Sequence, residues 1–453
     1  MRFSHPRRQR GAIAIMAALA MLVLLGVVGL VVDGGLAYLV KARLNAAVDS
    51  AALAGARAVT NGNNQAEQTA NAQAAAAEFF GANIASGYML SKPKLLSTTV
   101  TFDGGTAIID VRAEAPMPVS VMQVMGFASL TPNAYAQTIR KDLDMALVVD
   151  TSGSLSSVGA SVRASAKSFL NKFNVTQDRV TLVHFASGAE VDNAINPLTR
   201  GFDRTSMLKN IDAFTFKGGT SSVEGMWAAR DQLARIPSAS RSSMRVIVFF
   251  SDGAPTSFFT YLAFNTPTDC IDYGALDSVN GGTGLLDPKV SENGPLANAK
   301  CTLKYPASGS VKALPSWYNG HHGSWLLRND PGTLALPIVT NTPRVVTSDI
   351  ATYGGRNIDR AARNLAEAMA DKARDDGVFV FTLGMGAGLK DANDYDPAET
   401  GETVLKCMAN IADGPARCYN PAKPVGMYCY AATDADLTPC FSRLASAILR
   451  ISK

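Results

Sequence analysis

Hydrophobic residues form one continuous run near the start of this chain and alternate with polar residues farther along. Residues 12–32 are uncharged and mostly apolar, and about 20 such residues are enough to cross a bilayer as a helix. Apolar and small residues then recur at helical spacing over residues 34–59, which predicts that the same helix continues. Asn61-Gly62-Asn63-Asn64 is typical of a break. The pattern therefore predicts one membrane-spanning helix that extends beyond the bilayer.

A small α+β segment is predicted after the membrane-spanning part. An alanine-rich helix is expected at about residues 66–80, and residues 98–102 and 107–113 alternate between apolar and polar side chains. Asp103-Gly104-Gly105 lies between the two alternating stretches, and this pattern is typical of a β-hairpin. We therefore expect a short stalk of helices and strands over residues 33–140.

From residue 143 onwards, apolar runs and amphipathic stretches follow one another. Strands are expected at residues 145–149, 180–185, 246–250 and 378–383, with an antiparallel companion at 190–195 and an edge strand at 428–432. Helices are expected at residues 158–173, 207–214, 226–233, 357–375 and 437–451. This alternation predicts an α/β domain over residues 141–453, with a central, mostly parallel sheet covered by helices on both faces.

The alternation is interrupted at about residues 254–355. So long a connection without clear periodicity is usually functional or disordered. Because it begins directly after Asp252, we hypothesise that this insertion forms a lid or a recognition surface. The alternative is a disulfide-tied loop without such a role.

Side chains that carry oxygen follow several of the predicted strands. Asp150, Ser152 and Ser154 come straight after an apolar run, Asp252 follows another, and Thr220 lies in a glycine-rich loop. Ligands of open α/β sheets bind outside the carboxyl ends of the strands. Carboxylate and hydroxyl oxygens suit Mg²⁺ or Mn²⁺ rather than zinc or copper. The sequence therefore predicts a divalent metal site built from these five residues.

These motifs together resemble the metal-ion-dependent adhesion site of von Willebrand A-type domains. The resemblance consists of D-x-S-x-S at 150–154, Thr220 after two glycines, and Asp252 before Gly253. It extends from about Leu143 to the C-terminus, apart from the insertion, and implies a doubly wound, mostly parallel sheet. It also implies that an Asp or Glu of a protein partner completes the coordination of the metal. The alternative is the same fold with an idle site.

The N-terminal part resembles TadG-like proteins of the tight-adherence (Flp) pilus system of bacteria. Arg8-Gln9-Arg10-Gly11, Val32-Asp33-Gly34-Gly35 and residues 45–56 carry this resemblance. In that family an A-type domain commonly follows. Pilins of the system have glutamate at the fifth position after the cleavage glycine, where this chain has Met16. We therefore expect a permanent anchor rather than processing by a prepilin peptidase.

The charges around the apolar run predict its orientation. Arg7, Arg8 and Arg10 precede it and Asp33 follows it, so the positive-inside rule leaves residues 1–11 in the cytoplasm. A cleaved signal peptide is the rival interpretation, but the run is long and no clear A-x-A site follows. We expect a single-pass protein of the bacterial cytoplasmic (inner) membrane, in contact with the bilayer through residues 12–32, whose C-terminal domain is periplasmic.

Cysteine usage agrees with export. None of the six cysteines precedes Cys270, and the last four recur at intervals of eleven residues: Cys407, Cys418, Cys429 and Cys440. An even number on the exported side indicates disulfides, although sequence cannot choose among fifteen pairings. We favour a bond between Cys270 and Cys301, and local pairing of the last four. Free buried thiols are the alternative.

Composition and motifs narrow the class of function. The 453-residue chain has a net charge of +4 and 18% charged residues, too weak and dispersed a charge for nucleic-acid binding. Asp150-Thr151-Ser152 faintly resembles the aspartic-protease D-T-G motif, but serine interrupts it and no second copy follows an apolar strand. The few histidines make no set with a nucleophilic serine. We therefore do not expect an enzyme.

The predicted function is metal-dependent protein binding during assembly or anchoring of a tight-adherence pilus. Pilus subunits or assembly proteins are the expected partners. A structural envelope scaffold, in which the metal only stabilises the domain, is the alternative. His184 is expected to be a core or surface residue, and Glu224 and Asp192 are expected to be solvated.

Overall fold

The computed structural model of this protein divides into two compact units, Met1–Arg140 and Lys141–Lys453. It describes residues 10–59, 65–103, 106–140, 142–242, 244–267, 270–278, 284–286, 311–318 and 336–451. The predicted cytoplasmic tail falls almost wholly outside these described residues, as do Cys301 and most of the insertion.

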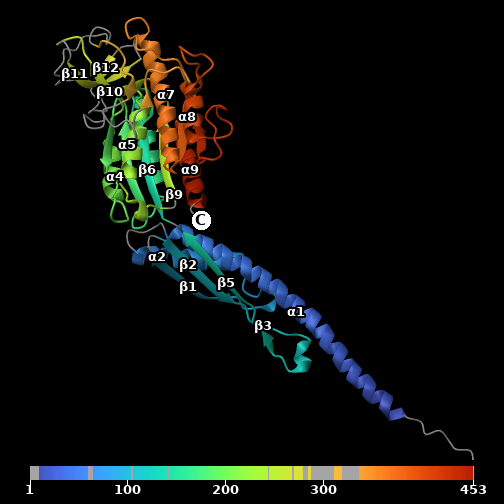
Figure 1. Ribbon diagram of the computed structural model, residues 1–453. Helices are drawn as coiled ribbons and strands as arrows, with labels where there is room; N and C mark the ends of the chain where they lie inside the picture. The colour runs from blue at the N-terminus through green and yellow to red at the C-terminus, as the bar shows by residue number, and fades with distance from the viewer. Residues whose placement is uncertain are drawn as a thin grey trace, which may run out of the picture. The chain divides into compact units, whose positions relative to one another are not determined.

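The first unit is a small sheet packed on the second half of one long helix (Figure 1). Its principal helices are α1 (Arg10–Ala58) and α2 (Gln65–Asn83), and its antiparallel sheet has the order β1-β2-β5, with β1 (Lys94–Asp103), β2 (Thr106–Glu114) and β5 (Asn133–Arg140). The alanine-rich helix and the hairpin agree with the sequence pattern, whereas β5 was not predicted. Buried α1 residues from Val40 to Ala56 contact buried residues of α2 and β2, and these make the core.

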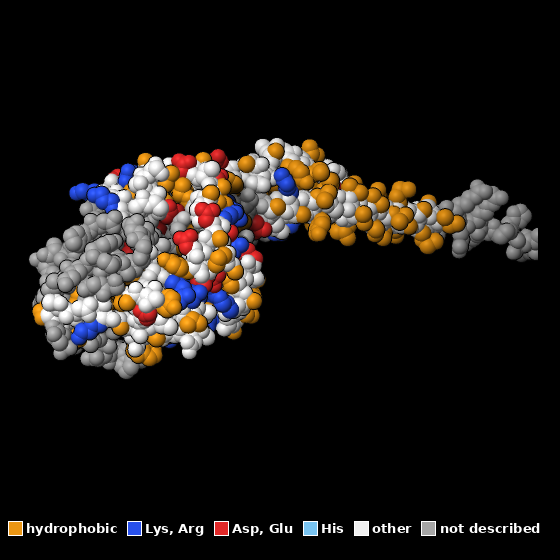
Figure 2. Space-filling model, turned by 90° about the horizontal axis from the view of Figure 1, so that it is seen from above, with side chains coloured by type: hydrophobic (Ala, Val, Ile, Leu, Met, Phe, Trp, Pro, Cys, Tyr) orange, Lys and Arg blue, Asp and Glu red, His pale blue; other side chains and the backbone are white. Residues whose placement is uncertain are grey.

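Most of the N-terminal part of α1 lies outside this core. Large apolar side chains from Ile13 to Val32 are exposed, and Figure 2 shows hydrophobic side chains covering this length of the helix. In the part of the chain that the structure describes, α1 is the one helix long and apolar enough to cross a membrane.

The second unit is built on a six-stranded sheet with the order β16-β15-β9-β6-β7-β8. The strands are β6 (Leu143–Asp150), β7 (Arg179–Phe185), β8 (Ala189–Asn193), β9 (Met244–Ser251), β15 (Phe379–Met385) and β16 (Met427–Ala431). All neighbours pair in parallel except β7 and β8, which are antiparallel. The predicted mostly parallel sheet, with β16 at its edge, is therefore confirmed.

Helices cover both faces of this sheet because the central strands are apolar on both sides. Along β6, Ala146 and Val148 face one hydrophobic core, whereas Met145, Leu147 and Val149 face the other. The first core includes α5 (Ser222–Ala234), α7 (Gly354–Asp375) and α8 (Gly401–Ala409), and the second includes α3 (Gly159–Leu170), α4 (Arg204–Asp212) and α9 (Leu437–Ile451). Both faces are thus shielded from water, as parallel sheets require.

The insertion contains strands that the sequence pattern did not predict. Its described parts include an antiparallel sheet of β10 (Ser257–Ala263), β11 (Ile271–Asp277) and β12 (Gly284–Leu286), and a pair of β13 (Trp317–Tyr318) and β14 (Leu336–Pro337). Phe258, Leu276 and Leu336 are buried in the same core as α5 and α7. The described parts of the insertion therefore belong to the folded domain.

Two disulfides close short segments at the C-terminal end of the domain. Cys407 is bonded to Cys418, and Cys429 is bonded to Cys440. The predicted local pairing of these four cysteines is therefore confirmed. The predicted Cys270–Cys301 bond lies outside the described residues, because Cys301 does.

Candidate metal centre

The candidate site begins where two neighbouring strands end. Asp150 is the last residue of β6 and Ser251 is the last residue of β9, and these strands pair in parallel up to Val149 and Phe250. Ser251 Oγ donates a 2.6 Å hydrogen bond to Asp150 Oδ2, and the backbone N–H of Ser152 donates a 2.7 Å bond to Oδ1. Asp150 is thereby held in one orientation at the carboxyl edge of the sheet.

The two serines of the D-x-S-x-S motif lie between this carboxylate and the next. Ser152 Oγ lies 3.2 Å from Ser154 Oγ, and Ser154 Oγ donates a 2.9 Å hydrogen bond to Asp252 Oδ1. Asp252 follows β9 directly, so the two carboxylates on either side of the hydroxyl pair come from loops that are distant in sequence. Four of the five predicted residues are therefore linked in one continuous polar chain.

Thr220 reaches the same place through a glycine-rich turn. The Gly153 N–H donates a 3.0 Å hydrogen bond to the Gly218 carbonyl, which joins this turn to the serine loop. A Cβ atom added to Gly253 would lie 3.8 Å from Thr220 Oγ1, so this hydroxyl lies beside the turn that carries Asp252. Gly218 has φ +92°, a conformation that side chains other than glycine rarely adopt. The structure thus brings all five predicted residues together, at what we call the β6–β9 site.

Burial makes the β6–β9 site unfavourable for charge. Burial, followed by the nearby charge of Asp252, raises the pKa of Asp150 to about 7, against hydrogen bonds from Ser152 and Ser251. Burial likewise raises the pKa of Asp252 to about 6, against the hydrogen bond from Ser154. Within the described residues, the donors to these two carboxylates are hydroxyls and backbone amides, with no lysine, arginine or histidine paired to them.

This donor set fits a hard divalent cation. Two carboxylates and three hydroxyls are oxygen ligands of the kind that Mg²⁺ and Mn²⁺ accept. A cation would also favour the charged form of both acids, which burial otherwise disfavours. The ligand roles of Asp150, Ser152, Ser154, Thr220 and Asp252 stay a prediction that the geometry supports.

The inserted sheet lies directly beside the threonine turn. The backbone N–H groups of Thr256 and Ser257 donate to the Thr220 carbonyl at 3.1 and 3.3 Å, and the Thr220 N–H donates to Thr256 Oγ1 at 3.2 Å. A Cβ atom on Gly219 would lie 2.4 Å from Asp277 Oδ2. The start of the insertion therefore helps to position a predicted metal ligand.

The structure also shows where sequence reasoning missed or misplaced residues. Ser251 was not assigned a role, although its position just before Asp252, at the end of a buried strand, could have indicated one.

The expectation that Glu224 and Asp192 are solvated was wrong. Glu224 is buried and accepts a hydrogen bond from Tyr318 of the insertion, and Asp192 Oδ2 lies 2.8 Å from Nδ1 of buried His184. Tyr318 and His184 lie on other elements of the fold, so the sequence next to Glu224 does not reveal its burial, and that next to Asp192 does not reveal its half-buried position.

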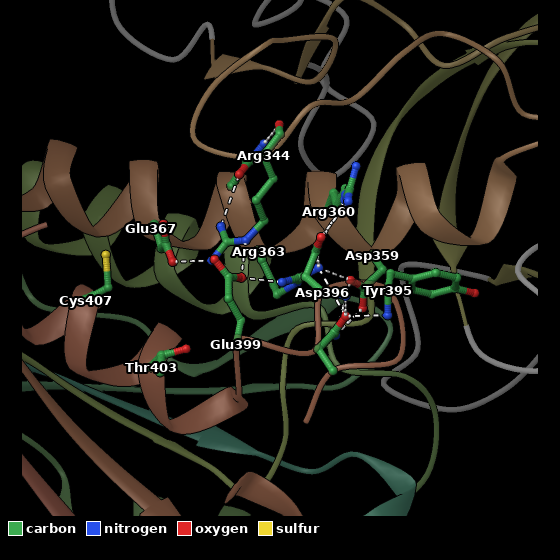
Figure 3. Close-up of polar contacts among 12 residues, drawn as sticks. Arg344, Asp359, Arg360, Arg363, Glu367, Tyr395, Asp396, Glu399, Thr403 and Cys407 are labelled. Atoms are coloured by element: carbon green, nitrogen blue, oxygen red, sulfur yellow. Dashed lines mark hydrogen bonds and ion pairs between the residues drawn. The ribbon is translucent and has the colours of Figure 1, made fainter. Parts of the chain in front are cut away.

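A second polar cluster lies along α7 and the loop before α8 (Figure 3). We call it the α7 ion-pair cluster; its arginine and acidic side chains pair with one another and are Arg344, Asp359, Arg360, Arg363, Glu367, Asp396 and Glu399. Fully buried Arg363 donates to Asp359, Asp396 and Glu399. Because these charges are compensated within the cluster, we assign it a structural role.

Two family models match the chain. Residues 11–58 match the family of Flp pilus-assembly TadE/G-like proteins, and residues 144–266 match the von Willebrand factor type A domain. Both predicted resemblances are therefore confirmed, and so is the predicted fold class, a mostly parallel A-type sheet flanked by helices and preceded by a long apolar helix. No curated protein matches the chain.

Similar solved structures include several pilus proteins. The open conformation of the pilus adhesin SpaC from Lactobacillus rhamnosus GG is 16% identical with a TM-score of 0.37, over 80% of this chain and 34% of SpaC. The vWF domain of the type V pili tip protein Mfa5 from Porphyromonas gingivalis is 14% identical with a TM-score of 0.37, over 70% of this chain and 98% of that domain. This chain thus spans about a third of SpaC.

One similar structure comes from outside bacteria. Proximal thread matrix protein 1 from the mussel byssus, with a zinc-occupied MIDAS motif, is 12% identical with a TM-score of 0.32, over 68% of this chain and 46% of that protein.

Proposed function

We propose that this protein is anchored in the membrane and assembles or anchors a tight-adherence pilus. The premise is that its chain joins a TadE/G-like segment to a von Willebrand factor type A domain. Residues 12–32 of α1 cross the cytoplasmic membrane, with residues 1–11 in the cytoplasm. Residues 33–140 form a periplasmic stalk, and residues 141–453 carry the A-type domain. The exposed apolar face of α1 supports the anchor.

The A-type domain binds a protein partner through a divalent cation at the β6–β9 site. When bound, Mg²⁺ or Mn²⁺ supplies a coordination position that a carboxylate of the partner can occupy. Ser152, Ser154 and Thr220 contribute neutral oxygens, so the cation keeps positive charge for that carboxylate. The observation that carries this proposal is the meeting of Asp150 and Asp252 around a hydroxyl pair, with no basic side chain of the described residues paired to them. The role is binding and not catalysis.

Thermal unfolding with and without metal tests the site. A ligand that binds only the folded state raises its stability, by about 2.7 kcal/mol at a concentration of 100 Kd. We expect the full-length protein to melt at higher temperature in Mg²⁺ or Mn²⁺ than in chelator. Asp413→Asn, in an exposed acidic residue, should respond as the wild type does. An identical melting temperature with metal and with chelator would exclude an occupied site.

A second experiment separates recognition from scaffolding. Asp150→Ala should leave the protein folded and in the membrane but prevent pilus assembly in cells, because the partner's carboxylate loses its cation. Circular dichroism and membrane fractionation monitor folding and location, with Asp413→Asn as the control. If Asp150→Ala unfolds the domain, or if pili form normally without it, the scaffold interpretation is favoured.

A further inference from the structure

One loop of the stalk lies against the apolar part of α1. The β3–β4 loop, residues 119–128, joins β3 (Met117–Pro118) to β4 (Ser129–Leu130) and contains the short helix η2 (Met122–Met125). A Cβ atom on Gly26 would lie 3.1 Å from Met125 Sδ, and one on Gly29 would lie 3.3 Å from the Met122 nitrogen. The two glycines therefore let the loop approach the helix closely, as small residues do in membrane helices.

Both glycines belong to the stretch proposed to cross the bilayer. Within residues 13–32 of α1, Gly29 is buried and Gly26 is half-buried, whereas large side chains such as Leu24 and Leu30 are exposed. Gly26 lies six residues before Val32, which is about 9 Å along a helix that rises 1.5 Å per residue. A loop that touches Gly26 therefore reaches about 9 Å into the apolar stretch from the end at Val32.

The composition of the loop suits a lipid environment. No Asp, Glu, Lys or Arg occurs over residues 115–139. Met125 and Phe127 keep 57% and 49% of their surface exposed, next to a helix face that is itself apolar and exposed. Exposed large apolar residues beside a membrane helix would be costly in water and favourable in lipid.

The backbone of the loop is prepared for a medium without water. Asp33, the first charged residue after the apolar stretch, accepts hydrogen bonds from the N–H groups of Ser120, Val121 and Met122 at 2.7 to 2.9 Å. The N–H groups of Gly126 and Phe127 donate to carbonyls within the loop at 3.0 and 3.3 Å. Backbone groups that enter the hydrocarbon must form their hydrogen bonds within the protein, and these five N–H groups do so.

We propose that the β3–β4 loop inserts into the outer leaflet of the cytoplasmic membrane beside α1, with Met125 and Phe127 among the lipids. This inference rests on the proposed membrane anchor. Insertion by about 9 Å matches the roughly 5–10 Å to which apolar faces penetrate the interface. A second membrane contact beside the helix limits its tilt and so orients the stalk.

Fluorescence quenching by brominated lipids tests the proposal. Phe127→Trp is reconstituted as the full chain in phosphatidylcholine–phosphatidylglycerol vesicles with bromine on the acyl chains, and its emission is compared with that in unbrominated vesicles. Phe79→Trp is the matched control, because Phe79 is 46% exposed and lies on α2. Its helix contacts α1 at Ser50 and Gly55, roughly 25 and 33 Å beyond Asp33 along the helix. The wild type supplies the background of the three native tryptophans.

We expect bromine to remove most of the emission that Phe127→Trp adds and to leave that of Phe79→Trp unchanged. Alkaline extraction of the same vesicles reports the anchor separately. If the protein resists extraction but Phe127→Trp is not quenched, the loop is outside the lipid and this inference fails while the anchor stands. Quenching of both variants also overturns it, because the whole stalk would then lie on the membrane. If alkali releases the protein, the anchor fails and the inference fails with it.

Discussion

The A-type domain contains two polar clusters with buried charged residues, and these clusters handle charge in opposite ways. In the α7 ion-pair cluster, Arg363 faces Asp359, Asp396 and Glu399, so positive and negative groups compensate one another. At the β6–β9 site, two carboxylates share serine hydroxyls, and no basic side chain of the described residues joins them. The first cluster is complete as the chain supplies it, whereas the second is completed, under the proposed function, by a cation from outside.

The comparison shows how burial alone fails to identify a binding site. Buried charges in both clusters lose hydration, but only compensated charges can be kept without a ligand. Burial raises the pKa of Asp150 and Asp252, and no positive group of the described residues opposes this effect. The absence of an internal counter-charge, more than the presence of acids, distinguishes a place for a cation from a structural ion pair.

The largest effect is expected from breaking the complete cluster. Arg363→Met leaves three acidic side chains without their shared partner and should lower the free energy of unfolding by about 3–5 kcal/mol. Urea unfolding of the full chain in detergent, followed by tryptophan fluorescence, measures this, since all three tryptophans lie in the second unit.

Arg235→Met is the matched control for that measurement. Arg235 is 55% exposed and pairs with Asp231 one helical turn away, so its loss should change stability by less than about 0.5 kcal/mol. Equal effects of the two substitutions would show that the α7 ion-pair cluster contributes no more than a surface pair.

The opposite response is expected at the β6–β9 site. Asp252→Asn removes a half-buried charge that has no counter-charge among the described residues, so the metal-free protein should be as stable as the wild type or more stable. The same variant should lose the stabilisation by saturating Mg²⁺, which is about 2.7 kcal/mol at 100 Kd. Urea unfolding with Mg²⁺ and with chelator gives both values. A large loss of stability without metal would contradict this expectation. It would show that Asp252, like Arg363, stabilises the fold by itself.

The pH dependence of the metal-free protein provides a third comparison. The folded state holds protons on Asp150 and Asp252 up to pKa values of about 7 and 6, whereas the unfolded chain releases them near pH 4. The folded state thus binds more protons in this window, and stability falls as pH rises through it. Asp150→Asn should reduce that fall by an amount on the order of 1–2 kcal/mol. Unchanged pH profiles would contradict the raised pKa values.

The smallest effect is expected from a single neutral ligand. Ser154→Ala removes one hydroxyl and its bond to Asp252, and a hydrogen bond contributes about 1 kcal/mol net. Mg²⁺ affinity should therefore fall by less than about tenfold, with little change in metal-free stability. Isothermal titration with Mg²⁺ measures the affinity, and Ser161→Ala, at another serine that donates to an acidic residue, should leave it unchanged.

Much of the domain could be predicted because its central strands and helices have strong local patterns. β6 and β9 are apolar on both faces, and α9 was predicted with its observed bounds. β10 was missed because Ser257 and Thr260 interrupt its apolar residues. Both polar residues are nevertheless buried, because other parts of the domain cover them. Such a strand lacks the regular pattern of apolar and polar residues from which a strand is predicted.

The amino-acid sequence by itself determined the long apolar helix, the alternation of strands and helices, and the oxygen-bearing side chains at the ends of two strands. Only the tertiary structure decided that Ser251 orients Asp150, that Glu224 is buried against the insertion, and that Asp33 receives three N–H groups from the β3–β4 loop. The physical reason is distance along the chain. Periodicity and strand ends are local properties, whereas a buried polar group depends on partners that folding brings from tens of residues away.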